Sequence, residues 1–200
     1  MKDLGEANFI LGIKLWRDRK NKMLGLSQTG YIDKVLEQFS MQNSKKGLLP
    51  FRHGVPLSDD QRPKTREEEN MMRQVPYASA VGSLMYVMLF TRLDISYSVG
   101  IVSLYQSNPG PKYWQDVKHI LKYLLRTRDF MLVYRCEDLI PIAYTDSDFQ
   151  SYLDFKKSTS GCVFTLGGEA ITWRSVKQSC IADSIVEAEF VAACEAEIPF

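Results

Sequence analysis

The sequence predicts an α+β protein, with helices in the middle of the chain and strands concentrated in its last third. Residues 112–128 carry apolar side chains at helical spacing, which predicts an amphipathic helix. After Arg128 the periodicity becomes strand-like, and four predicted strands come before one last helix. Strands that are grouped in one part of the chain and closed by a helix are typical of an α+β fold.

The N-terminal part predicts a β-hairpin followed by a helix. Residues 8–16 are bulky and partly alternating, residues 18–22 are polar, and residues 23–27 can return as a second strand. Thr29 is expected to cap a helix that runs to about Phe39, because threonine oxygens accept hydrogen bonds from the free N–H groups of a first turn.

A long connection separates this part from the next helices. Residues 43–70 contain three prolines and many charges, which predicts a surface loop with a short helix near residues 66–72. A buried helix is expected at residues 77–90, where small residues are interspersed among large apolar ones. A second helix, capped by Asp94, is expected to extend to residue 105.

The helix at residues 112–128 has a basic face beside its apolar one. Lys118, Lys122 and Arg126 share this face. A basic face is ordinary for a solvated helix, but a row of Lys and Arg can also hold the phosphates of a nucleic acid. The pattern alone leaves both interpretations open.

The last third predicts four strands, a tight hairpin and a closing helix. The strands are expected at residues 130–134, 140–145, 160–166 and 169–174, with Gly167-Gly168 as the turn between the last two. Asp183 or Ser184 is expected to cap the helix. Its apolar residues are Val186, Phe190, Val191 and Cys194.

The net charge, the cysteines and the absence of a targeting pattern indicate which class of protein to expect. The net charge of +1 gives no electrostatic argument for binding nucleic acid, so such binding must come from local clusters. The four cysteines form no C-x-x-C pair and are expected to be reduced and mostly buried. No signal pattern opens the chain, and the apolar stretch at residues 81–90 is too short to span a bilayer. These features predict a soluble cytoplasmic or nuclear protein that does not contact a membrane.

Two groups of carboxylates are candidates for chemistry. Asp146 and Asp148 are expected at the end of a hydrophobic strand, and Glu187 and Glu189 on the final helix. Mg²⁺-dependent phosphodiester hydrolysis needs hard oxygen ligands on rigid elements, and a strand aspartate with a helical glutamate can supply them. Because such pairs occur in most proteins, the pattern alone does not establish a metal site.

Longer stretches of sequence carry a family resemblance. Four segments of the last third resemble, in order, the ribonuclease H domain of copia-type (LTR) retrotransposon Pol polyproteins: Tyr144-Thr145-Asp146-Ser147-Asp148, Lys157-Ser158-Thr159-Ser160-Gly161, Trp173-Arg174-Ser175-Val176-Lys177-Gln178 and Glu187-Ala188-Glu189-Phe190-Val191-Ala192. Upstream segments resemble the part of the same polyprotein's reverse transcriptase that follows its catalytic centre; they include Phe9-Ile10-Leu11-Gly12-Ile13, Tyr77-Ala78-Ser79-Ala80-Val81-Gly82-Ser83, Thr91-Arg92-Leu93-Asp94-Ile95 and Lys118-His119-Ile120-Leu121-Lys122-Tyr123-Leu124.

The resemblance implies four regions. Residues 1–40 would be the palm-edge hairpin and helix of the reverse transcriptase, and residues 41–75 a linker. Residues 76–128 would be a helical thumb or connection region, and residues 130–200 a truncated ribonuclease-H-like domain with a mixed sheet and one helix.

The resemblance also implies site residues. Asp146 matches the strand aspartate of the family's ribonuclease H site, and Glu189 matches its helical glutamate because the following Phe-Val-Ala would pack on the sheet. Glu187 is the alternative to Glu189, and Asp148 would be a further ligand. In such enzymes these carboxylates bind Mg²⁺, and a water cleaves the RNA strand of an RNA–DNA hybrid. A nucleic-acid role for Lys118, Lys122 and Arg126 gains support from the same family.

The sequence lacks several features of the family, and three hypotheses follow from this. The Tyr-x-Asp-Asp polymerase motif and the later acidic residues of ribonuclease H are absent, and Pro199 interrupts the final helix. The first hypothesis is therefore a Pol fragment that is inactive by itself. The second is a working segment of a larger polyprotein, and the third is a domesticated nucleic-acid-binding module without catalysis.

Overall fold

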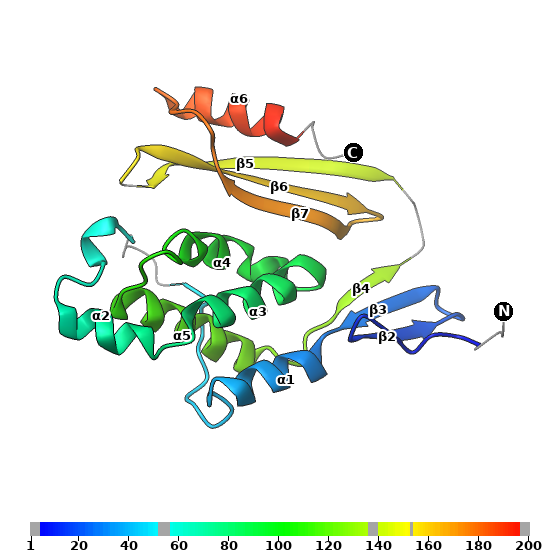
Figure 1. Ribbon diagram of the computed structural model, residues 1–200. Helices are drawn as coiled ribbons and strands as arrows, with labels where there is room; N and C mark the ends of the chain where they lie inside the picture. The colour runs from blue at the N-terminus through cyan, green and yellow to red at the C-terminus, as the bar shows by residue number, and fades with distance from the viewer. Residues whose placement is uncertain (1–4, 52–56, 136–139, 153, 197–200) are drawn as a thin grey trace.

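The computed structural model describes residues 5–51, 57–135, 140–152 and 154–196. Within these residues the chain forms two antiparallel sheets and six α-helices. Figure 1 shows the second sheet, residues 141–177, between α6 on one side and the helical region on the other. The predicted α+β class is confirmed at this coarse level.

The first sheet combines the N-terminal hairpin with a strand from much later in the chain. Its strands are β1 (Phe9–Ile10), β2 (Ile13–Asp18), β3 (Met23–Ser27) and β4 (Leu132–Arg135), in that order. The predicted return strand is confirmed. The expectation that residues 130–134 join the later strands is wrong, because β4 pairs with β3.

The single strand expected at residues 8–16 is in fact two short strands. Leu11 and Gly12 both have positive φ, 49° and 78°, and form the two-residue turn that joins β1 to β2. Turns with two left-handed residues match the twist of antiparallel strands and normally contain glycine. The glycine was visible in the sequence, but its position inside an apolar run concealed the turn.

Five helices make up the middle of the chain. They are α1 (Thr29–Gln38), α2 (Arg66–Arg73), α3 (Tyr77–Phe90), α4 (Ser96–Ser103) and α5 (Pro111–Arg126), with two 3₁₀ turns, η1 (Asp59–Gln61) and η2 (Leu93–Ile95). The predicted helices at residues 66–72, 77–90 and 112–128 are confirmed within a residue or two.

The predicted cap of α1 is wrong by one residue. Gln28 is the N-cap and Thr29 is already helical. The Thr29 hydroxyl instead donates to the carbonyl of Arg128, 3.1 Å away, and ties α1 to the end of α5. The Gln28 side chain is buried and accepts a hydrogen bond from the Thr91 hydroxyl at 2.6 Å.

The main core is built around α5. Most of its apolar face is fully buried, at 0% exposure for Tyr113, Val117, Ile120, Leu121 and Leu124. These side chains pack against buried residues of α1, α3 and α4, such as Leu36, Leu84 and Val99. Burying each large aliphatic side chain contributes about 1.5–3 kcal/mol, so this face holds the helical region together.

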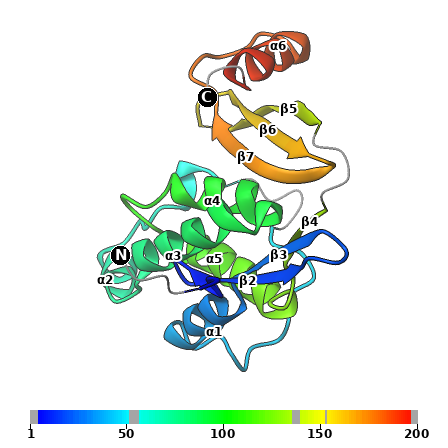
Figure 2. The same ribbon diagram turned by 90° about the vertical axis from the view of Figure 1, so that its right-hand side faces the viewer.

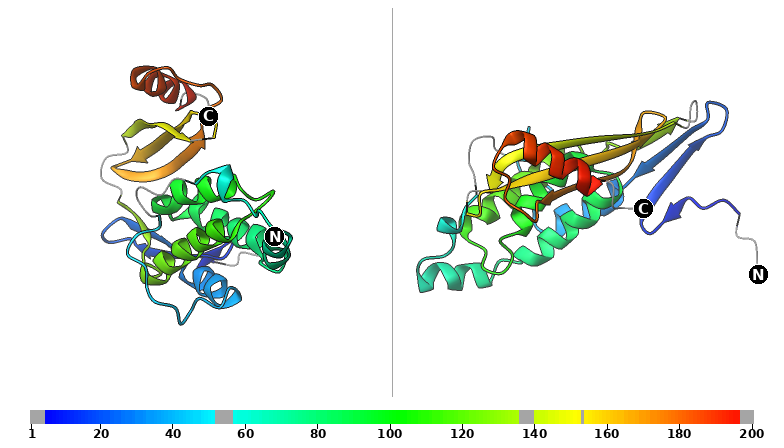
Figure 3. Two further views of the ribbon diagram at one scale, coloured as in Figure 1. Left: turned by 90° about the vertical axis from the view of Figure 1, so that its left-hand side faces the viewer. Right: turned by 90° about the horizontal axis from the view of Figure 1, so that it is seen from above.

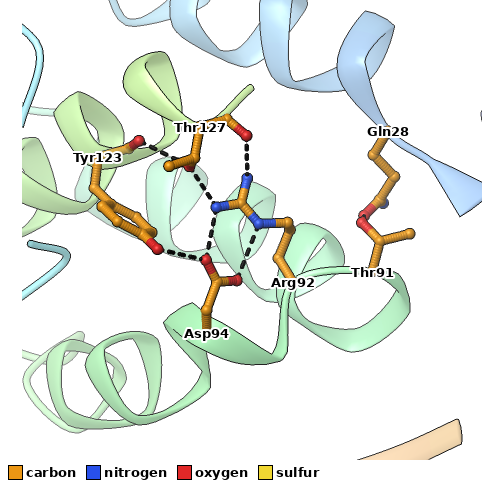
Figure 4. A network of polar contacts seen from close by, with 6 residues as sticks. All are labelled: Gln28, Thr91, Arg92, Asp94, Tyr123 and Thr127. Atoms are coloured by element: carbon orange, nitrogen blue, oxygen red, sulfur yellow. Dashed lines mark hydrogen bonds and ion pairs between the residues drawn. The ribbon is translucent and has the colours of Figure 1, made fainter. Parts of the chain in front are cut away.

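An ion pair between the buried Arg92 and the partly exposed Asp94 fixes the turn between α3 and α4 (Figure 4). The Arg92 guanidinium, 2% exposed, lies 3.0 and 2.8 Å from the two Asp94 carboxylate oxygens and 3.1 Å from the Thr127 carbonyl. The Tyr123 hydroxyl donates to the same carboxylate at 2.7 Å. Asp94 is therefore a partner of Arg92 inside η2 and not the predicted cap of a helix, which explains why α4 starts later, at Ser96.

The second sheet consists of three long antiparallel strands. They are β5 (Pro141–Tyr152), β6 (Lys157–Leu166) and β7 (Glu169–Lys177), with β5 and β7 at its edges. The predicted turn is confirmed, since Gly167 and Gly168 have φ of 60° and 84°. The mixed sheet implied by the family resemblance is not found, because all described strand pairs are antiparallel.

Helix α6 (Ile185–Ala196) covers one face of this sheet, as Figure 2 and the view from above in Figure 3 show. Ser184 caps it by accepting a hydrogen bond from Glu187 N at 3.1 Å. The expectation that Phe190 packs on the sheet is wrong, since that side chain is 69% exposed. Ala188 and Ala192 face the sheet instead, at 0% and 1% exposure.

The structure also tests the expectations on cysteine burial and on membrane-spanning helices. The cysteines are not mostly buried: Cys162 is half-buried, Cys180 and Cys194 are exposed, and Cys136 lies outside the described residues. Among the described helices, none combines the length and the apolar character that crossing a bilayer requires.

Candidate carboxylate site

Strand pairing decides which way the two aspartates point. Asp146 and Asp148 lie in the middle of β5, not at the end of a strand as expected, opposite Gly161 and Thr159 of β6. Side chains alternate between the two faces of a strand, so these two aspartates share a face. That face is turned toward α4, because the Tyr97 hydroxyl donates to Asp148 Oδ2 at 3.2 Å.

The two aspartates lie in a cavity of about 320 Å³ between the helical region and the sheet. Leu93, Ser96 and Tyr97 line its helical side, and Trp173 lines the sheet side with the aspartates. Burial, and after it the charge and hydrogen bond of Asp148, raises the pKa of Tyr97 to about 12. The Tyr97 hydroxyl therefore remains a hydrogen-bond donor at neutral pH.

Polar contacts dock the sheet on the rest of the chain around this groove. The Trp173 indole N–H donates to the Met88 carbonyl at 2.8 Å, and the Tyr134 hydroxyl to the Ala170 carbonyl at 2.9 Å. On another side, Asp154 Oδ2 accepts a hydrogen bond from the Asp59 amide at 2.8 Å. The groove therefore has walls from two parts of the chain that are far apart in sequence.

Glu189 approaches the same strand from the other side of the sheet. It lies on α6, and its Oε1 accepts a hydrogen bond from the Ser147 amide at 3.4 Å. Glu189 thus contacts the backbone of β5 next to Asp146, while the Asp146 side chain lies on the face turned toward α4.

Glu187 has a different position. It is exposed, and its Oε2 accepts a hydrogen bond from the Asp183 amide at 2.7 Å, so it takes part in the first turn of α6. Of the two glutamates, Glu189 is the one that contacts β5.

The donor chemistry of the site suits a hard cation. Asp146 and Asp148 present carboxylate oxygens in one groove, and Mg²⁺ is usually held by one or two carboxylates together with water and substrate oxygens. In the part of the chain that the structure describes, no three His, Cys, Asp or Glu side chains gather as a metal cluster. The two aspartates could therefore hold Mg²⁺ only with water or further ligands.

The basic face of α5 is less open than its sequence suggests. Lys118 and Lys122 are half-buried, and the loop after α1 crosses the helix where the Gly47 amide donates to the Lys122 carbonyl at 2.9 Å. The Lys118 ammonium lies 5.9 Å from the centre of the Trp114 ring. Arg126 is exposed.

A second basic surface was not anticipated from the sequence. Arg17, Arg19 and Lys22 of the β2–β3 hairpin line a groove of about 350 Å³ together with Arg135 of β4. Asp18 lines the same groove, and Arg19 also pairs with Glu6. The high density of charge in residues 17–22 could have indicated this surface from the sequence. The contribution of Arg135 could not have been predicted, because it depends on the pairing of β4 with β3.

Sequence comparisons identify relatives over nearly the whole chain. The chain is 47% identical over 195 residues to the retrovirus-related Pol polyprotein from transposon TNT 1-94 of Nicotiana tabacum, covering 98% of the chain and 15% of that protein. It is 40% identical over 126 residues to secreted RxLR effector protein 161 of Plasmopara viticola, covering 62% of the chain and 89% of that protein. It is 30% identical over 197 residues to the putative transposon Ty5-1 protein of Saccharomyces cerevisiae, covering 98% of the chain and 62% of that protein.

The Pol polyproteins among these relatives are much longer than this chain, and the similarity to them is one of sequence alone. No family model and no solved structure matches the chain. The chain spans only 15% of the tobacco polyprotein and 12% of the retrovirus-related Pol polyprotein from transposon RE1 of Arabidopsis thaliana, to which it is 32% identical. By its identity over almost its full length, the chain is homologous to a segment of the retrovirus-related Pol polyproteins of transposons.

Proposed function

We propose that the chain is the Pol segment that joins the end of the reverse transcriptase to the beginning of the ribonuclease H, and that its second sheet supplies ligands of a ribonuclease-H-type metal site. The observation that supports this proposal is that Asp146 and Asp148 share one groove, while Glu189 contacts Ser147, the residue between them. The proposed substrate is the RNA strand of an RNA–DNA hybrid.

The carboxylates have different roles in the proposed site. Asp146 and Asp148 hold Mg²⁺ on the groove side of β5, and Glu189 lies beside the backbone of the same strand, on the side covered by α6. Bound Mg²⁺ supplies positive charge that stabilises the attacking and leaving oxygens of a phosphodiester. The hydrogen bond from the Ser147 amide keeps the Glu189 carboxylate beside β5.

We further propose that this segment does not cleave by itself. Hydrolysis with two metal ions about 3.5–4 Å apart needs several ligands on one side of the substrate. The described residues bring two carboxylates, Asp146 and Asp148, into the groove, and Glu189 contacts the same strand from the α6 side. The other ligands would come from the rest of the polyprotein.

Cation binding tests this proposal directly. Asp146→Asn should weaken binding of Mn²⁺, used as a paramagnetic substitute for Mg²⁺, by at least roughly tenfold, because a ligand charge is removed. Free Mn²⁺ would be followed by electron paramagnetic resonance. Asp129→Asn is the matched control, since Asp129 is an exposed carboxylate away from the groove (77% side-chain exposure). Unchanged Mn²⁺ affinity in Asp146→Asn would reject the site, and cleavage of a labelled hybrid by this chain would reject its inactivity.

A second candidate function, nucleic-acid binding without catalysis, has support from the basic hairpin groove. Four cations line this groove, although Arg19 pairs with Glu6 and Asp18 also lines it, and such side chains can contact phosphates. Lys118 and Lys122, in contrast, are half-buried. We expect Lys22→Gln and Arg135→Gln each to lower the slope of log affinity against log salt by about 1 on an RNA–DNA hybrid. Fluorescence anisotropy at several salt concentrations would measure it. A reduced slope in Arg126→Gln, with no change in the hairpin variants, would place the contact on α5 instead.

A further inference from the structure

We infer that Tyr97, on the first turn of α4, is a positioning residue for Asp148, so that the carboxylate groove of the sheet depends on the helical region for its geometry. This inference rests on the proposed metal site. It adds a residue that lies 51 positions before Asp148 in the sequence and on a different part of the fold.

The contact between the two side chains is specific. The Tyr97 hydroxyl donates to Asp148 Oδ2 at 3.2 Å, which leaves the other carboxylate oxygen available. Asp148 is an exposed residue of β5. Without a partner, an exposed aspartate samples several rotamers, so a single hydrogen bond from across the groove selects the orientation in which Asp148 faces α4.

The Tyr97 ring is itself held in place. It makes an edge-to-face contact with Phe51, with ring centroids 6.0 Å apart and an interplanar angle of 90°, and only 37% of the residue is exposed. The two aromatic rings restrict the position of the hydroxyl. Tyr97 therefore provides a fixed donor, and Asp148 is the side chain that adapts to it.

The backbone of α4 is anchored independently of the sheet's carboxylates. The Arg92–Asp94 ion pair fixes η2 immediately before α4, and Val99 and Val102 are fully buried in the helical core. Gly100 lies against β7, where a Cβ atom would be 3.5 Å from the Ser175 carbonyl oxygen. These contacts set how far Tyr97 reaches toward β5.

The space beside the contact is open to a ligand. Gly161 is the cross-strand partner of Asp146, so no side chain stands between Asp146 and the middle of the sheet at that level. Asp146 and Asp148 would be the residues of this groove that hold a cation, and the Tyr97 hydroxyl orients Asp148 without being a ligand itself.

A double-mutant cycle on the full chain tests the inference. Tyr97→Phe removes only the hydroxyl and should weaken Mn²⁺ affinity by roughly threefold to tenfold, the range expected for losing one hydrogen bond. In an Asp148→Asn background the same change should have no further effect, because the group that Tyr97 positions is no longer a charged ligand. Tyr31→Phe is the control, since Tyr31 lies on α1 outside this groove and its ring packs against Tyr86, with centroids 4.7 Å apart.

The outcomes separate this inference from the proposed function. If Mn²⁺ affinity depends on Asp146 and Asp148 but not on Tyr97, the positioning role is wrong and the metal site stands. If Tyr97→Phe weakens binding equally in both backgrounds, the effect is structural and the positioning role is also wrong. If no Mn²⁺ binding depends on Asp146, the metal site fails, and the positioning role fails with it.

Discussion

Replacing Arg92 with leucine is expected to lower the free energy of unfolding by about 3 kcal/mol. The guanidinium is almost fully buried and makes hydrogen bonds to Asp94 and to both the carbonyl and the hydroxyl of Thr127 (Figure 4). Leucine would leave the Asp94 carboxylate and the Thr127 carbonyl without this partner. Removing one member of a buried pair typically costs about 3–5 kcal/mol, and the lower end applies because the Asp94 side chain is 34% exposed.

Urea unfolding of the wild type and the variant would measure this difference. Arg62→Leu is the matched control, because Arg62 also pairs with an aspartate, Asp59 at 2.7 Å, but both side chains are about 40% exposed. Exposed pairs contribute about 0–1 kcal/mol, so the control should unfold at nearly the wild-type urea concentration. Equal losses in the two variants would contradict the buried network as the source of stability.

The same network predicts how acid affects the protein. Burial by itself would raise the pKa of the Asp94 carboxyl, but the hydrogen bonds and charge of Arg92, with the Tyr123 hydroxyl, hold that pKa below its ordinary value. A carboxyl with a lowered pKa in the folded state contributes stability that is present above its unfolded pKa, near 4, and is lost as the pH falls through the folded value. Asp94→Asn should therefore flatten the loss of stability below about pH 4.

Local patterns predicted most elements of the helical region. The small and apolar residues at positions 77–90 and the amphipathic spacing of α5 required only the chain's own periodicity, and both helices are found at nearly the expected residues. The errors lie where a tertiary contact decides the outcome. Asp94 has the residue type of a helix cap, but a buried Arg92 only two positions away takes up its carboxylate.

The candidate site shows the same limit. The identity of Asp146, Asp148 and Glu189 as candidates came from the sequence and its family resemblance. Their arrangement in space could not be predicted from the sequence. It depends on which face of β5 turns toward α4 and on α6 covering the other face. No sequence pattern near Tyr97 indicated its contact with the site, because its partner Asp148 is 51 residues away.

The packing of α6 was misjudged for a physical reason. Large apolar residues such as Phe190 usually face a core, but α6 presents alanines to the sheet, and Ala188 and Ala192 are almost fully buried. Small side chains allow a helix backbone to lie close to a sheet. A close approach also brings the Glu189 carboxylate within 3.4 Å of the Ser147 amide. The distance between α6 and β5 is therefore a property on which both stability and the proposed site depend.

Ala192→Leu should disturb that distance, with an expected loss of about 1–3 kcal/mol in the free energy of unfolding. Ala192 is 1% exposed, so three additional carbon atoms have no space unless α6 moves away from the sheet. The matched control is Ala193→Leu, one residue along the same helix but exposed, which should change the free energy of unfolding by less than about 0.5 kcal/mol. Chemical denaturation of both variants would give the difference.

The same variant separates two possible roles of Glu189. If its carboxylate contributes to cation binding, moving α6 outward should weaken Mn²⁺ affinity in Ala192→Leu even under conditions where the variant is fully folded. Ala193→Leu should bind Mn²⁺ as the wild type does. A destabilised but folded Ala192→Leu protein with unchanged Mn²⁺ affinity would show that Glu189 only anchors α6 to the strand. In that case the two aspartates of the groove, and not the helical glutamate, would be the ligands that this segment contributes.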